Sequence, residues 1–406
     1  MLPSQGTGGQ PSTGSTIRKH PVVVIGASAT GLFTSYLLAR QGVPVRVIER
    51  SPQLDPASRT LIVTARMREI LGEAGEQSVV NEIHRFELFT DGRAATITLN
   101  QPDLIIERSE LIRGLAAVAV AAGAEVALGK QFQALRPNGN GLKVEVTEAG
   151  SPLRSEFTAD TVVAADGAVS RVAAAAGWPS QQTVPLIQAI VRLPRDMPPD
   201  TVRVWFVPQD TPYFYWLIPE SESRGALGLI GVRGREVRGH LESFLRKRGL
   251  EALAFQGARI PVYRRWTPVR RKVGRADVYL VGDAAGQVKV TTVGGIVTGL
   301  RGAVGVADAI LTGGASSELN ALRRELNWHL LLRKSLHHFQ QADYSRLVDL
   351  LNDPARRSLG ECSRDNALKL LWKVCANQPR LVLMGLRGLL TRGRFSEGEQ
   401  DVGNRS

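Results

Sequence analysis

Two segments far apart in the chain carry small residues and acidic side chains in patterns that suit phosphate and sugar groups. The first follows the apolar run Val22–Ile25 and consists of Gly26, Ala27, Ser28, Ala29, Thr30 and Gly31. A buried strand that enters a glycine turn and then a helix presents backbone N–H groups and the positive end of the helix dipole to an anion. Glu49 ends the next apolar run, with Arg50 beside it, and its carboxylate can accept hydrogen bonds from a ribose. We therefore predict a dinucleotide site.

This first segment departs from Gly-x-Gly-x-x-Gly at its middle position, where Ser28 stands. The middle glycine normally lets the backbone approach the phosphates closely. A serine there predicts either a slightly displaced ligand or a contact made by the hydroxyl group.

The second segment repeats the pattern near the other end of the chain. The apolar run Val278–Val281 is followed by Gly282 and Asp283, then by small residues, and later by Gly294, Gly295 and Ile296. The carboxylate of Asp283 can accept a hydrogen bond from a sugar or ribityl hydroxyl, and a helix that begins near Gly295 would aim its positive end at electron-rich ring atoms. Between the two segments, Asp166 and Gly167 close another apolar strand. One cofactor held by both ends of a chain is typical of a flavoprotein.

With these motifs the sequence resembles flavoproteins of the para-hydroxybenzoate hydroxylase type and, within them, the geranylgeranyl reductase family, from Val22 to about residue 350. The resemblance implies bound FAD, with Arg108 near it, Asp283 on the ribityl chain and the amides of Gly294–Ile296 at the pyrimidine edge of the flavin. The chain has no second glycine motif for a resident nicotinamide, so the resemblance implies NAD(P)H as a transient electron donor.

The substrate side of the resemblance rests on Phe214, Tyr215 and Trp216. In the reductases a comparable Tyr-x-Trp-x-Phe-Pro segment helps to line the isoprenoid cavity, although these aromatic residues could equally form ordinary sheet core. One departure points elsewhere. The reductases usually carry Lys-Pro-Cys-Gly after the second strand, whereas this chain has no cysteine before Cys362, and its corresponding region, Ala57–Thr60, is more like the hydroxylase branch.

Three functions follow. The leading hypothesis is an FAD-dependent oxidoreductase that delivers hydride to an apolar, isoprenoid-like substrate. The second is a flavin monooxygenase that hydroxylates or epoxidises a hydrophobic or aromatic compound. The third is a non-redox isomerase or cyclase, or a binding module that uses FAD as a scaffold. No residue is singled out as a proton donor; the candidates are Tyr213, Tyr215, His240 and Lys289, and we expect Lys289 to be solvated.

The positions of the apolar runs predict an α/β fold. We expect a Rossmann-like FAD-binding domain of the glutathione-reductase type, an antiparallel-sheet substrate domain and a C-terminal helical region. The FAD-binding domain is assigned residues 21–66, 104–178 and 271–312, the substrate domain 67–103 and 179–270, and the helical region 313–406. Residues 1–20 are expected to be a disordered tail. Asp91-Gly92 predicts a tight hairpin turn, and Ser109 is expected to cap the helix Ser109–Ala122.

The composition of the chain limits which kinds of partner and cofactor we expect. The 406 residues are 43% hydrophobic and 22% charged, with two cysteines and no metal-ligand spacing, so we expect an ordinary globular protein of a reducing compartment without a metal. The net charge of +13 comes without a nucleic-acid-binding motif, so nucleic acid is not expected. We expect a cytoplasmic protein. Gln378–Phe395 is basic and amphipathic and is either a peripheral membrane contact or simply a last packed helix.

Overall fold

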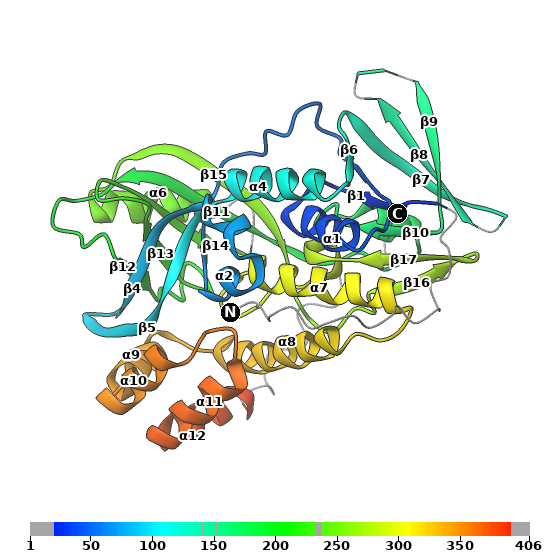
Figure 1. Ribbon diagram of the computed structural model, residues 1–406. Helices are drawn as coiled ribbons and strands as arrows, with labels where there is room; N and C mark the ends of the chain where they lie inside the picture. The colour runs from blue at the N-terminus through cyan, green and yellow to red at the C-terminus, as the bar shows by residue number, and fades with distance from the viewer. Residues whose placement is uncertain (1–19, 140, 149, 152, 233–236, 391–406) are drawn as a thin grey trace, which may run out of the picture.

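A computed structural model describes residues 20–139, 141–148, 150–151, 153–232 and 237–390. Two large sheets lie side by side, and a layer of helices from the C-terminal part of the chain covers one side of both (Figure 1). The expected tail at 1–20 falls almost wholly outside the described residues, as does the end of the basic segment, residues 391–395.

The six-stranded sheet is built from short apolar runs that are buried on both faces, as parallel strands require. Its order is β16-β17-β10-β1-β2-β6, and all neighbours pair in parallel except the edge strand β16. The strands are β1 Val22–Ile25, β2 Val45–Ile48, β6 Glu125–Ala127, β10 Thr161–Ala164, β16 Arg270–Val273 and β17 Ala276–Leu280. Helix α1 packs between two other helices of this part; the three are α1 Ala29–Ala39, α4 Arg108–Ala121 and α7 Ile296–Thr312. A small antiparallel sheet, with the short helix α5 beside it, extends this part: β7 Lys130–Asn138, β8 Gly141–Glu148, β9 Arg154–Ala159 and α5 Arg171–Ala175.

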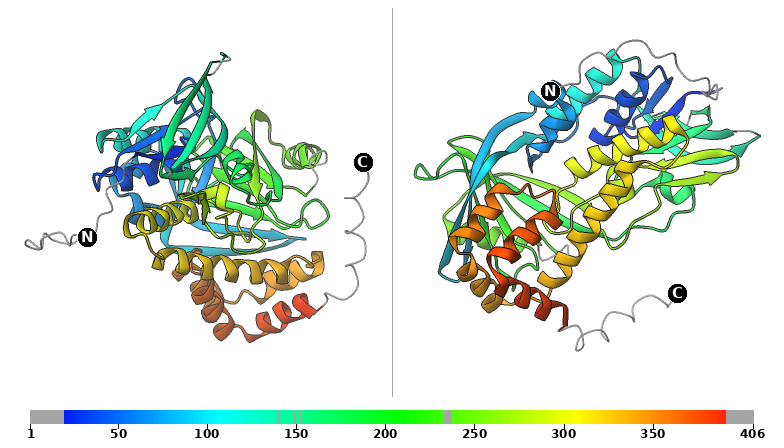
Figure 2. Two further views of the ribbon diagram at one scale, coloured as in Figure 1. Left: turned by 90° about the vertical axis from the view of Figure 1, so that its right-hand side faces the viewer. Right: turned by 60° about the horizontal axis from the view of Figure 1, so that its bottom comes forward.

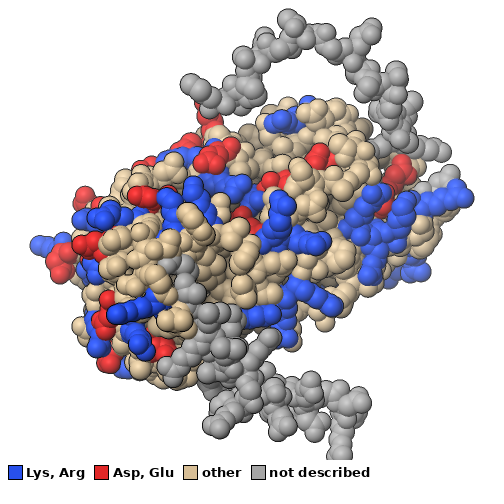
Figure 3. Space-filling view, turned by 90° about the horizontal axis from the view of Figure 1, so that it is seen from below, with Lys and Arg blue, Asp and Glu red and all other residues tan. Residues whose placement is uncertain are grey.

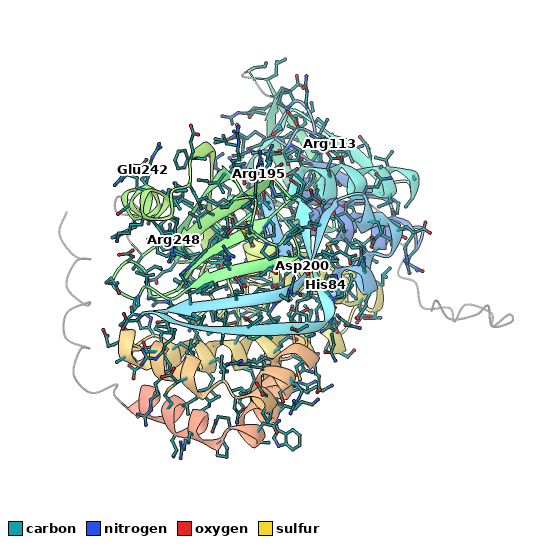
Figure 4. The ribbon with its side chains drawn as sticks, turned by 90° about the vertical axis from the view of Figure 1, so that its left-hand side faces the viewer. His84, Arg113, Arg195, Asp200, Glu242 and Arg248 are labelled. Atoms are coloured by element: carbon teal, nitrogen blue, oxygen red, sulfur yellow. The ribbon has the colours of Figure 1, made fainter. Side chains whose placement is uncertain are left out.

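The eight-stranded sheet has the order β15-β11-β14-β13-β12-β4-β5-β3. Its strands pair antiparallel except for the parallel pair β4 and β12, which joins the early and late parts of the chain. The strands are β3 Thr60–Val63, β4 Val79–Thr90, β5 Arg93–Glu107, β11 Thr183–Arg192, β12 Thr201–Trp205, β13 Tyr215–Pro219, β14 Arg224–Ile230 and β15 Ala252–Pro261. Helix α6, Val237–Arg248, packs on one face of this sheet; Glu242 lies on its outer side, and the guanidinium of Arg248 lies over the ring of Trp205 (Figure 4).

The remaining helices are short connectors or members of the C-terminal layer. The connectors are α2 Arg66–Leu71, α3 Glu73–Glu76 and the 3-10 turn η1 Gly282–Ala285. The layer comprises α8 Ser317–Leu336, α9 Gln341–Leu350, α10 Asp353–Glu361, α11 Ala367–Asn377 and α12 Pro379–Leu390 (Figure 2). None of the helices in the described parts of the chain combines the length and the hydrophobicity that crossing a bilayer requires.

The predicted α/β class is confirmed, and several details differ. The Asp91-Gly92 hairpin forms with positive φ at both residues, and its strands are longer than expected. Ser109 is not the N-cap of α4: Glu107 caps the helix, and its carboxylate accepts a hydrogen bond from the Ser109 N–H. The eight-stranded sheet already begins with β3, inside the range 21–66 that the sequence assigns to the other part. Helix α6 was not foreseen.

Candidate active site

A single cavity of about 1030 Å³ lies between the carboxyl ends of the central parallel strands and one face of the eight-stranded sheet. Strands β1, β2, β10 and β17 pair in register, so the segments that follow them meet at one edge of the sheet. In open α/β sheets this edge is where ligands bind. Of the residues that the sequence assigns to the cofactor, all line this cavity except Gly31 and Gly282: Gly26, Ala27, Ser28, Ala29, Thr30, Glu49, Arg50, Arg108, Asp166, Gly167, Asp283, Gly294, Gly295 and Ile296.

The first glycine turn needs its glycines for close backbone approach. Gly26 has a φ of +105°, and a Cβ there would lie 2.5 Å from the carbonyl oxygen of Ala165. A Cβ on Gly31 would lie 2.3 Å from the carbonyl oxygen of Gly26, so this glycine closes the turn and does not face the cavity. Ser28 is the N-cap of α1, and its hydroxyl accepts a hydrogen bond from the Gly31 N–H at 3.2 Å. The serine that replaces the motif's middle glycine therefore serves the helix.

Glu49 and Asp166 are both held by hydrogen bonds at the edge of the cavity. The Glu49 carboxylate accepts backbone hydrogen bonds from Ala27 and Ser51, each at 2.9 Å, which ties the end of β2 to the glycine turn. Asp166 accepts hydrogen bonds from the Ser170 hydroxyl at 2.5 Å and from a backbone N–H in α5. Burial raises the pKa of Asp166 although these hydrogen bonds act in the opposite direction. Both carboxylates are fixed before any ligand arrives.

Two arginines face Asp283 across the cavity. Burial raises the pKa of the Asp283 carboxyl, and the charges of Arg59 and Arg108 oppose that rise. Burial, with a further contribution from Arg108, lowers the pKa of Arg59 to about 10, and the Arg59 Nε atom is buried without a hydrogen-bond partner. Glu107 also faces both arginines and Glu49 faces Arg108, so the charges in this region are mixed, and the orphaned N–H of Arg59 is a buried donor without a partner. Such a site suits an electron-rich ligand.

Arg59 was not among the predicted site residues. It lies in the Ala57–Thr60 stretch that resembles the hydroxylases, and the backbone N–H of Arg108 donates to its carbonyl oxygen at 3.1 Å. The resemblance of this stretch was its only signal in the sequence. The contact between Arg59 and Arg108 depends on the pairing of β3 with β5, whose residues lie about fifty positions apart in the chain.

Helix α7 directs its N-terminus at the cavity. Its N-cap is Gly295, no side chain caps it, and a Cβ on Gly295 would lie 3.3 Å from an Asp283 carboxylate oxygen. The first N–H groups of a helix have no partner within the helix, so those of Ile296 and its successors remain available to a ligand. Gly282 does not reach the cavity; its φ is +64°, and a Cβ there would lie 2.6 Å from the Thr30 hydroxyl. Its role is to let η1 pack against α1.

Lys289 contradicts the expectation of a solvated side chain. It lines the cavity but is only 5% exposed, and its ammonium group forms an ion pair with Asp365 from the C-terminal layer. Asp365 also accepts a hydrogen bond from Thr64. Burial disfavours the charged form of Asp365, but Lys289, Thr64 and Arg364 outweigh it and lower the pKa of its carboxyl. The sequence could not reveal this pair, because nothing local links positions 289 and 365.

The eight-stranded sheet supplies the apolar part of the cavity. Phe214 and Trp216 line it, whereas Tyr215 does not. Successive side chains of a strand point to opposite faces, so Tyr215 faces α6, where it stacks on Phe244 and donates a hydrogen bond to Asp210 at 2.9 Å. We therefore withdraw Tyr215 from the substrate-binding set. The other apolar lining residues of this part are Leu61, Ile62, Val63, Phe86, Leu88, Ile97, Leu99, Leu186, Val202, Val204, Phe206, Ile218, Ile230 and Ile260.

Of the four proton-donor candidates, Lys289 alone lines this cavity. Tyr213 packs under the guanidinium of Arg333, 4.0 Å from its ring centroid, and burial raises its pKa. His240 lies on α6, where its Nδ1 atom is 3.6 Å from Asp210.

Comparison with known proteins agrees with this geometry. Residues 19–321 match the model of the FAD binding domain family. The chain belongs to this family. FAD is its cofactor, and it is an FAD-dependent oxidoreductase of the para-hydroxybenzoate hydroxylase type.

Relatives in sequence and in structure extend the similarity over most of the chain. Digeranylgeranylglycerophospholipid reductase 2 of Methanothermobacter thermautotrophicus is 28% identical over 353 residues, which cover 82% of this chain and 89% of the relative. A geranylgeranyl bacteriochlorophyll reductase-like structure from Thermoplasma acidophilum has a TM-score of 0.75 at 18% identity, covering 91% of this chain and 99% of that one. Aklavinone-11 hydroxylase with FAD and aklavinone has a TM-score of 0.56 at 20% identity, covering 79% and 68%. The fold is thus shared by proteins named as reductases and as hydroxylases.

Proposed function

We propose that this protein reduces an isolated carbon–carbon double bond in an isoprenoid-like, apolar substrate. The observation that supports this most directly is the continuity of one cavity, which begins at the glycine turns and ends among the apolar side chains of the eight-stranded sheet. Four of the sequence relatives carry the name digeranylgeranylglycerophospholipid reductase, and that name favours the same substrate class.

Each part of the cavity has a proposed role. Reduced FAD supplies hydride when it is bound. The amides of Ser28, Ala29 and Thr30 would hold its diphosphate, since those of Gly26 and Ala27 already donate to Ile48 and Glu49. Glu49 would hold the adenosine ribose through the lone pairs that remain on its two carboxylate oxygens. Asp283 would accept from the ribityl chain. The first amides of α7, together with Arg59 and Arg108, would stabilise negative charge on the ring.

Phe214 and Trp216 would position the substrate, and the dense apolar lining around them would exclude water. We assign Lys289 as the group that holds a proton at the cavity wall, because its side chain lines the cavity and its ammonium group pairs with Asp365. Product formation needs one hydride on one carbon of the double bond and one proton on the other. The lysine would be reprotonated from solvent after each turnover.

The test is an anaerobic turnover with chemically reduced enzyme and a panel of prenyl lipids and aromatic compounds, read by mass spectrometry. Double-bond reduction predicts a product that gains two hydrogens and no oxygen. Conversion without consumption of reductant would instead identify an isomerase or cyclase, and binding without conversion would identify a scaffold.

Flavin monooxygenation is the second candidate function, and one observation favours it. Arg59 lies in the cavity region where the resemblance places a cysteine in the reductases, and the lining residues that the structure describes include no cysteine. The discriminating experiment is aerobic turnover under labelled oxygen. Incorporation of one labelled oxygen atom into the product would select the monooxygenase and refute reduction.

For either reaction we propose that NAD(P)H reduces the flavin during a transient visit. Titration of the enzyme with NADH or NADPH under nitrogen should decrease the absorbance of the oxidised flavin. If the flavin stays oxidised with both nicotinamides but is reduced by ferredoxin, this part of the proposal is wrong.

A further inference from the structure

The outer face of the C-terminal layer carries three large apolar side chains in the open. On α11, Leu368 is 49% exposed and Trp372, one turn later, is 72% exposed; on α12, Leu383 is 68% exposed. We call these three residues the outer apolar patch. Exposed apolar residues scattered singly are ordinary, but two at helical spacing, one of them a tryptophan, form a stripe that no described part of the chain covers.

The two helices that carry this patch contain basic but no acidic residues. From residue 367 to residue 390 the sequence contains Lys369, Lys373, Arg380 and Arg387 and neither aspartate nor glutamate. Lys373 pairs with Glu361 of α10 at 3.0 Å, while Lys369 and Arg380 are exposed. Figure 3 looks at this side of the molecule and shows Lys and Arg side chains spread between uncharged areas, with Asp and Glu side chains among them. An apolar stripe edged by cations is complementary to an anionic lipid surface.

The inner face of the same helix belongs to the cavity. Leu370 of α11 lines it, together with Leu359 of α10 and Arg364 of the connecting turn. A single helix of eleven residues therefore separates the substrate cavity from Leu368 and Trp372 of the outer apolar patch. A protein whose substrate is delivered from a bilayer needs its membrane-facing surface to lie next to its substrate cavity in this way.

We propose that the outer apolar patch docks on an anionic phospholipid bilayer and that α11 is the wall past which an apolar substrate enters. The docking does not depend on the reaction; the entry route rests on the proposed function. The patch differs from the segment that the sequence suggested, since two of its three apolar residues precede Gln378. Tryptophan is the residue that favours the bilayer interface most, because its ring is apolar and its N–H can stay hydrated.

A second copy of the chain fits this face less well. In a two-fold contact the same patch meets itself, so Lys369 and Arg380 would approach their own copies, and neither α11 nor α12 carries a carboxylate to offset them. A stable dimer also buries about 800 Å² on each partner, which three apolar side chains do not provide. The charge and the size of the patch both favour lipid.

Flotation of the FAD-loaded full chain with vesicles, without substrate or reductant, tests the docking. Vesicles of phosphatidylglycerol and phosphatidylcholine should carry the protein upward, and vesicles of phosphatidylcholine alone should carry much less. The double variant Leu368→Ser/Trp372→Ser should lower the partition coefficient about tenfold or more. The matched control Leu253→Ser, on an exposed position of the edge strand β15, should leave it unchanged. Lys369→Gln/Arg380→Gln should weaken binding about fivefold for each charge and remove most of its salt dependence.

Three results would overturn the proposal. One is equal binding to both vesicle types, or to neither. Another is a Leu368→Ser/Trp372→Ser variant that keeps its FAD and floats as the wild type does. The third is a concentration-dependent dimer that the same variant abolishes, which would make a second copy the occupant. If the double variant loses its FAD, Trp372→Phe decides: brominated lipid should quench wild-type fluorescence and quench this variant clearly less. Failure of turnover with normal flotation would refute the reaction and leave the docking intact.

Discussion

Replacing Asp365 by asparagine removes the countercharge of a buried lysine without removing a side chain of that size. The substitution leaves the Lys289 ammonium at the cavity wall with a neutral amide in place of a carboxylate. In the wild type the two side chains are 6% and 1% exposed. Removing one partner of a pair this deeply buried costs about 3–5 kcal/mol, because the remaining charge stays desolvated.

The measurement is urea-induced unfolding, followed by far-UV circular dichroism and by release of FAD. The matched control is Asp349→Asn, which breaks the ion pair with Arg93 on the surface, where the side chains are 45% and 54% exposed and the expected cost is below about 1 kcal/mol. The double variant Lys289→Met/Asp365→Leu should recover most of the lost stability, since two apolar side chains need no charge compensation.

The pH dependence of Asp365→Asn follows from the sign of the shift. The pKa of Asp365 lies below its ordinary value of 3.8, so its ionisation stabilises the folded state above that pH. That contribution is complete at pH 7 and disappears as the pH falls through the lower folded value. The difference in the free energy of unfolding between the wild type and Asp365→Asn should therefore be constant from pH 5 to 7 and shrink in stronger acid. If Asp365→Asn proves no more destabilising than Asp349→Asn at pH 7, the account of a buried, functional pair is refuted.

Three further predictions address other parts of the site. Gly31→Ala places a Cβ 2.3 Å from the Gly26 carbonyl oxygen, so the turn must shift and the affinity for FAD should fall about tenfold or more. The flavin absorbance of the purified variant measures this, and retention of wild-type affinity would contradict the turn geometry. Trp216→Ala should enlarge the cavity and impair turnover, whereas Tyr215→Phe should lower the free energy of unfolding by about 1 kcal/mol and leave the product unchanged. Turnover and unfolding assays measure these effects, and a turnover defect in Tyr215→Phe but not in Trp216→Ala would restore Tyr215 to the site. Burial lowers the pKa of His329 from 6.5 to about 3, so stability should fall as the pH drops below 6.5, and His329→Leu should flatten that slope in pH-dependent unfolding; an unchanged slope would place its cause elsewhere.

The nucleotide end of the site could be predicted because its determinants are local. Gly26 and Gly31 are required by the backbone of one turn, and Glu49 and Asp166 end strands that are recognisable as apolar runs. Parallel pairing then brings the ends of those strands to one edge without any further information.

The other features depended on information that a single sequence lacks. The sequence assigned Phe214, Tyr215 and Trp216 together to the substrate, whereas Phe214 and Trp216 line the cavity and Tyr215 does not. The phase of the strand's alternation decides which side chains face inward, and only the register with β14 fixes that phase. Arg59 and Asp365 reach the cavity through long-range contacts. Helix α6 was missed because its polar outer face and short apolar stripe resemble a charged loop.

The parallel sheet also constrains the order in which this protein can mature. Strand β10 pairs on one side with β1 and on the other with β17, so the floor of the nucleotide site is incomplete until the chain has been synthesised past Leu280. Lys289 gains its buried ion-pair partner only after Asp365 has been synthesised. A nascent chain therefore exposes the apolar lining of an empty pocket for most of its synthesis, and supply of flavin at the moment of release should govern how much of the polypeptide escapes aggregation.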